Sequence, residues 1–215
     1  MSRLIPSVAL LLSVLSLAPA SAATYDEAVS GDLSNNRLFP GFLQLDYSPV
    51  GNVPGSNLIS GSLLRAPGTT PDRDYLHVNV PVGYVLGRLL VGNQTTVGGA
   101  GSFIGLAASS IFPVPESAPD AQGLLGFRVY GAADRGTDIL DDMAIPEAGS
   151  SGFSRPLGAG DYTFWIQELA VGTYAWRFNL VLEPAAAVVP VPATAPLFLA
   201  GLGLLAWRAR ARRAG

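Results

Sequence analysis

Alternation of apolar and polar residues is the strongest pattern in the second half of the chain. From Tyr174 to Leu182 every second residue is large and apolar, and Tyr162, Phe164 and Ile166 follow the same rule. A period of two is typical of a β-strand with one buried face. We therefore predict two strands here, with these alternating residues in the core and a C-terminal hairpin turning through Leu169–Gly172.

Six shorter strands are expected upstream, separated by glycine and proline clusters that favour turns. They cover residues 42–47, 57–64, 75–80, 84–91, 102–107 and 124–130. A single helical turn is expected at residues 137–143, with Thr137 as its N-cap and Pro146 ending it. About eight strands with little helix predict an all-β fold, a two-sheet antiparallel β-sandwich of jelly-roll character.

The N-terminal 22 residues have the features of a signal peptide. Arg3 precedes an apolar run, and Ala20-Ser21-Ala22 supplies the small residues that signal peptidase requires. We expect cleavage after Ala22 or Ala23. The mature body then comprises residues 23–184.

The C-terminal segment is predicted to direct the protein to a membrane. A Pro/Ala linker (185–196) precedes an apolar segment (197–207), and no charge occurs from Ala185 to Trp207. That length is close to what a helix needs to cross a hydrocarbon core of roughly 30 Å. The last segment (208–215) is rich in arginine and is expected to stay in the cytoplasm, with the body outside. The tail arginines are Arg208, Arg210, Arg212 and Arg213.

The residues of this tail resemble a known sorting signal. Val189, Pro190, Val191, Pro192 and Ala193, followed by one apolar segment and a terminal arginine cluster, resemble the PEP-CTERM signal of exported Gram-negative proteins, in its V-P-x-P-A variant. Val191 stands where the commonest form has Glu. The resemblance implies that an exosortase, a transpeptidase-like membrane protease, recognises the precursor in the inner membrane. It also implies removal of the tail and transfer of the body to the cell surface or an extracellular polysaccharide matrix. The alternative is a single-pass anchor that is never cut.

The body carries a second resemblance. Asn57–Leu63, the Asp72-Arg-Asp74-Tyr75 strand, the Pro81-Val-Gly83 turn and Leu157–Ile166 are similar to segments of the bacterial pre-peptidase C-terminal (PPC) domain. These segments span most of the body. The resemblance implies a β-sandwich.

Composition and charge exclude several classes of function. The chain has no cysteine, which excludes disulfides, thiol nucleophiles and cysteine metal sites. Eight arginines, no lysine and all 16 acidic residues lie between Thr24 and Pro184, so the body carries a formal charge of −8. An acidic body argues against nucleic acid as a partner.

The search for catalytic chemistry gives no candidate. The one histidine, His77, lies inside a predicted strand and is expected to be an ordinary strand-face residue, since with no cysteine and no second histidine it cannot form a common zinc site. No Gly-x-Ser-x-Gly motif supports a serine nucleophile. We therefore expect no enzymatic activity.

Calcium is the one cofactor that the sequence suggests, because it binds carboxylates in loops. The candidate ligands are Asp72 and Asp74 at the start of a strand, and Asp138, Asp141 and Asp142 in an acidic segment that begins at Asp134. Turn-forming and helix-capping aspartates are the alternative interpretation.

Trp165 is the candidate for ligand binding. It lies on the opposite parity from the predicted core residues, so its ring is expected to face outward, where it could stack on a sugar or be covered by a loop. The sequence thus favours a non-enzymatic exported surface or matrix protein. The alternative is a carbohydrate-binding or carbohydrate-active matrix domain.

Overall fold

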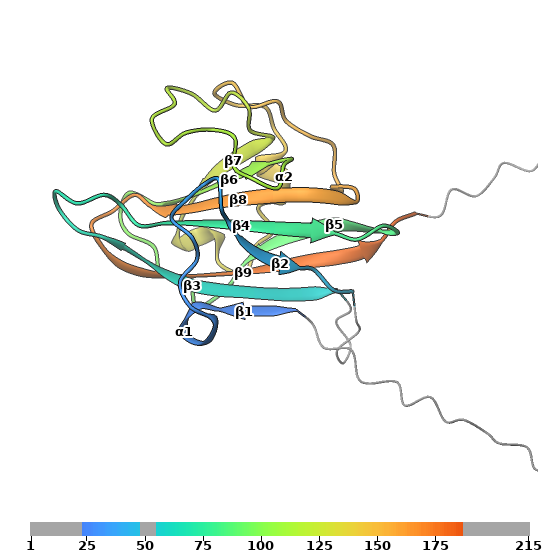
Figure 1. Ribbon diagram of the computed structural model, residues 1–215, viewed down its shortest axis with the longest axis horizontal. Helices are drawn as coiled ribbons and strands as arrows, with labels where there is room; N and C mark the ends of the chain where they lie inside the picture. The colour runs from blue at the N-terminus through green and yellow to red at the C-terminus, as the bar shows by residue number, and fades with distance from the viewer. Residues whose placement is uncertain (1–22, 48–54, 187–215) are drawn as a thin grey trace, which may run out of the picture. The chain divides into compact units, whose positions relative to one another are not determined.

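The computed structural model describes residues 23–47 and 55–186, which form two packed β-sheets (Figure 1). The predicted all-β sandwich is confirmed. The first sheet contains β1 (Thr24–Asp26), β3 (Ser56–Arg65), β9 (Gly172–Pro184) and β5 (Tyr84–Val91), in that order. The second contains β2 (Gly41–Gln44), β4 (Arg73–Val80), β8 (Gly160–Glu168), β6 (Ser102–Ala107) and β7 (Gly126–Tyr130). The short helices are α1 (Glu27–Ser30), η1 (Ala132–Asp134) and α2 (Leu140–Met143).

The predicted signal peptide and the predicted linker, sorting motif, apolar segment and arginine tail lie outside the described residues, apart from the first two linker residues. Within the described part of the chain, no helix is long and apolar enough to cross a membrane.

Strand pairing is nested along the chain, which gives the sandwich its jelly-roll character. In one sheet β9 pairs with both β3 and β5, and in the other β8 pairs with both β4 and β6, all antiparallel. The chain therefore folds back on itself as one long double strand and alternates between the sheets. The two parallel pairs, β1 with β3 and β2 with β4, add a short edge strand to each sheet.

The predicted C-terminal hairpin is wrong. β8 and β9 lie in different sheets, and the Leu169–Val171 link crosses from one to the other. The Arg65 guanidinium holds this crossing by donating to the Leu169 carbonyl at 2.6 Å. The alternation of apolar and polar residues along a strand indicates which side chains are buried. This pattern is identical for two strands that pair in one sheet and for two strands that face each other across the core, so it could not distinguish the two arrangements.

The alternating residues form the core as predicted, except Tyr174, whose side chain is only half-buried and donates its hydroxyl to the Val171 carbonyl at the surface. Tyr162, Phe164 and Ile166 from β8 are buried against Trp176 and Phe178 from β9. Burial of these large side chains between the sheets is the main stabilising contribution to the fold.

The free edge of β5 is covered by the segment between η1 and β8. Isolated bridges join Leu90 to Asp138 and Leu86 to Leu157. The predicted helical turn occurs here as α2, but Thr137 is not its N-cap. Asp138 instead accepts from the amide of Leu140 at 3.1 Å, while the Thr137 hydroxyl donates back to Asp134.

The loop between β6 and β7 lies over the outer face of the five-stranded sheet. Its Phe112 ring packs against Tyr75 of β4 with centroids 5.5 Å apart, and its Ser109 carbonyl accepts from the Thr163 hydroxyl at 2.6 Å. These contacts bury Tyr75 in a second, smaller apolar cluster.

Leu89→Ala should lower the free energy of unfolding by about 2–5 kcal/mol, because Leu89 is fully buried between the sheets. Val82→Ala, at a side chain that is 91% exposed, is the matched control and should change it by less than about 0.5 kcal/mol. Urea unfolding of both variants measures the difference. Similar values for the two would contradict the assigned core.

Candidate metal centre

The N-terminal segment brings two carboxylates against the sandwich. β1 lies parallel to β3, and Asp26 at its end accepts from the Ala28 amide, which starts the one-turn helix α1. Glu27 follows at once. Its two carboxylate oxygens accept from the amides of Leu33 at 3.1 Å and Ser62 at 2.8 Å.

Gly61 makes room for the Glu27 carboxylate. A Cβ at this position would clash with that carboxylate and with the Trp176 ring. Glycine is therefore required on β3 where the N-terminal segment approaches it most closely.

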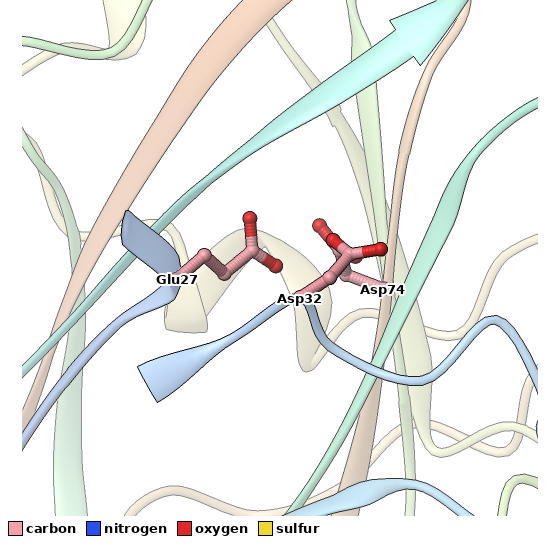
Figure 2. Close-up of side chains that lie close together, drawn as sticks. All are labelled: Glu27, Asp32 and Asp74. Carbon is pink, nitrogen blue, oxygen red and sulfur yellow. The ribbon is translucent and has the colours of Figure 1, made fainter. Parts of the chain in front are cut away.

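Glu27 meets two further carboxylates, from Asp32 and Asp74 (Figure 2). Each of the three offers one oxygen, and these oxygens all lie within 4.8 Å of one another. Asp32 is exposed, Glu27 is intermediate and Asp74 is fully buried. Glu27 and Asp32 also line a surface hollow, so the group has a path to solvent.

Asp74 lies at the base of this carboxylate cluster. Asp74 points to the core side of β4 and is 0% exposed. Its Oδ2 accepts a hydrogen bond from the indole N–H of Trp176, in the other sheet, at 2.6 Å. Its Oδ1 is buried and has no hydrogen-bond partner in the described residues. Burying a carboxylate oxygen without a hydrogen-bond partner costs free energy. Binding a proton or a cation at this atom would remove that cost.

Burial and like charge raise the pKa of all three carboxyl groups of the cluster. Burial, followed by the charge of Glu27, raises the pKa of Asp74 to about 9, although the Trp176 hydrogen bond opposes the shift. Burial also raises the pKa of Glu27 against the two amides, and burial and the charge of Asp72 raise the pKa of Asp32.

A hard divalent cation is the other way to compensate these charges. Three carboxylates with no nitrogen or sulfur donor form a ligand set suited to Ca²⁺ or Mg²⁺, and Ca²⁺ tolerates the irregular arrangement better. No arginine among residues 23–47 and 55–186 forms an ion pair with any of the three. The cluster therefore lacks an internal counter-ion in the described structure.

Of the predicted calcium ligands, only Asp74 belongs to this cluster. Asp72 accepts from the side-chain amide of Asn35 and from the Leu64 amide, and acts on the cluster through its charge.

The second predicted group already has counter-ions. Arg155 pairs with Asp138 and Asp141, and Arg128 pairs with Asp134 and Asp142. These guanidiniums supply the positive charge that a metal would bring, so we do not retain this group as a calcium site.

The remaining residues singled out in the sequence lie away from the carboxylate cluster or outside the described residues. His77 is on the outer face of β4, 2.9 Å from Asp161, as expected of a strand-face residue. Trp165 faces outward as predicted, but its ring packs with Tyr75, Phe103 and Phe112 instead of forming an open platform. Sorting motif and tail arginines lie outside the described residues.

Sequence reasoning missed Glu27 and Asp32. The only signal near them is their acidity, and nothing in their spacing indicates that the N-terminal segment passes the start of β4. Comparison with known proteins gives no match to a family model, to a curated protein or to a solved structure.

The metal-free protein should become less stable as the pH rises. In the unfolded chain Asp74 titrates near its ordinary pKa of 3.8, whereas in the folded protein its pKa is about 9. Between these values the folded state holds a proton that the unfolded state releases, so raising the pH favours unfolding. We expect the melting temperature measured in chelator to fall from pH 5 to pH 8.

Asp74→Asn is the control for this pH effect. The amide oxygen can still accept from Trp176, and the charge is gone. The variant should therefore be more stable than the parent at pH 8 in chelator and should lose most of the pH dependence. An unchanged pH profile would show that Asp74 does not carry the buried charge.

Proposed function

We propose that this chain is an exported, non-enzymatic protein of the cell surface or extracellular matrix, whose precursor is sorted through its C-terminal tail and cut by an exosortase. The observation that carries the proposal is that the buried core of the body ends before the sorting motif begins. The last buried residue is Leu182, and β9 ends at Pro184, whereas the sorting motif begins at Val189. Cleavage at or near that motif would leave every buried core residue of the described body in place.

The N-terminal end supports the same proposal. β1 begins at Thr24, and the Ala23 carbonyl already accepts from the Leu58 amide at 3.0 Å. Signal peptidase cleavage after Ala22 preserves this bond, whereas cleavage after Ala23 removes it. Ala23, the first residue of the mature form expected after cleavage at Ala22, is therefore already hydrogen-bonded to the sandwich.

Intact-mass analysis of the protein recovered from its native host tests the sorting proposal. We expect a chain that starts at Ala23 and ends between Pro184 and Ala193. A mass that retains Arg213 would instead indicate the permanent single-pass anchor and would overturn cleavage by an exosortase.

We also propose that calcium is the resident ion of the body, bound by Glu27, Asp32 and Asp74. Outside the cytoplasm this ion would replace the protons of the carboxylate cluster and tie the N-terminal segment to β4. Water or carbonyl oxygens would have to complete the coordination, since Ca²⁺ takes six to eight oxygen ligands. The role is structural, because binding only to the folded state stabilises that state.

Calcium should raise the melting temperature of the protein at pH 8, and the rise should shrink at pH 5, where protons compete for the same oxygens. Asp32→Asn removes one exposed ligand and should abolish most of the calcium response. Asp120→Asn, which changes a surface carboxylate away from the cluster, should keep it. Thermal melts in chelator and in millimolar calcium make the comparison, and equal responses of the two variants would rule out this site.

A further inference from the structure

A pocket on the outer face of the five-stranded sheet has features that the proposed function does not use. It lies between the sheet and the loop joining β6 to β7, and its volume is about 290 Å³. Ligand pockets in proteins generally begin near roughly 300 Å³, so this one has room for a single ring-sized group.

One wall of the pocket is aromatic. Phe103 and Phe127 stack with centroids 5.9 Å apart, and Phe103 meets Trp165 edge to face at 4.9 Å. The opposite wall comes from the loop and includes Val114 and Ala118. The indole N–H of Trp165 is buried and has no hydrogen-bond partner in the described part of the chain.

Three polar side chains line the same pocket, and each accepts a hydrogen bond from a neighbouring group. Glu116 Oε1 accepts from the Tyr75 hydroxyl at 3.0 Å, Asp120 Oδ1 accepts from the Gln122 amide at 3.1 Å, and Gln167 Oε1 accepts from Arg73 at 3.1 Å. Among the described residues, no hydrogen bond engages the other carboxylate oxygen of Asp120 or the amide nitrogen of Gln167, whereas the Glu116 carboxylate also accepts from its own backbone amide. The pocket therefore offers two fixed acceptors and one fixed donor.

The acidic residues Glu116 and Asp120 determine which ligand charge the pocket accepts. Burial would raise the pKa of Glu116, but its own backbone amide, the Tyr75 hydroxyl and the charges of Arg73 and Arg37 together lower it. Glu116 is therefore ionised at neutral pH, and with Asp120 it repels an anionic ligand.

We propose that this pocket binds one uncharged pyranose residue of a glycan. A pyranose has a face of C–H groups that packs on an aromatic wall and a rim of hydroxyls that both donate and accept. Those hydroxyls match Glu116, Asp120 and Gln167, while uronic acids are excluded by charge. This goes beyond export and sorting, since it assigns the body a ligand of its own.

Titration of ¹⁵N-tryptophan-labelled full-length protein tests the proposal, in a zwitterionic detergent that has no sugar head group. The probes are methyl glycosides of glucose, galactose, mannose and N-acetylglucosamine. We expect at least one to shift the Trp165 indole signal saturably. Trp176, which is bonded to Asp74, should not respond and is the internal control. Trp165→Phe assigns the signal.

Variants locate the binding. Glu116→Gln and Asp120→Asn should each weaken binding about tenfold, as expected for loss of a hydrogen bond to a charged group. Ala118→Phe should block the pocket. Glu147→Gln, which changes a surface carboxylate that does not line the pocket, should bind like the parent. Unchanged melting temperatures show that the variants fold.

Three results would overturn the proposal. The first is the absence of a saturable shift with all four glycosides at 50 mM, about fifty times a millimolar dissociation constant. The second is an equal shift with methyl glucuronide, which would contradict the exclusion of anions. The third is an equal shift with cyclohexanol, which would mean that the pocket takes any small apolar ring.

Discussion

The hydrogen bond between Asp74 and Trp176 is the contact on which the N-terminal half of the sandwich depends. It joins β4 of one sheet to β9 of the other within the core, and it fixes the indole ring against which Gly61 and Glu27 pack. A carboxylate at this depth is tolerated only with compensation. The N-terminal segment that covers it adds two more carboxylates instead of a counter-ion, so this end of the molecule is stable only when protons or a cation are present.

The sequence predicted the strands well where one face is buried over several residues. β5 and β6 have the predicted bounds, and β3, β4, β8 and β9 agree to within two residues. It missed β1 and α1, because three or four residues are too few to show a period. It also joined β8 and β9 in a hairpin, since alternation along a strand carries no information about which sheet the strand enters.

The candidate site was predicted only in part, for a related reason. Asp74 was identified as a possible cation ligand from its position at a strand start, but its partners come from a segment more than forty residues earlier in the chain. The acidic segment after Asp134 looked equally suitable in sequence. Its aspartates face Arg128 and Arg155, and only the three-dimensional fold brings those cations to them.

The nested pairing has a consequence for how this chain can fold. β9 is the partner of both β3 and β5, and the bond between the Ser56 hydroxyl and Asn179 joins residues 123 positions apart. The four-stranded sheet therefore cannot join β3 to β5 until nearly the whole body is available, and long-range pairing of this kind is intrinsically slow. A chain built this way cannot complete this sheet before β9 is available, a property that suits the unfolded passage through a translocation channel that the proposed export requires.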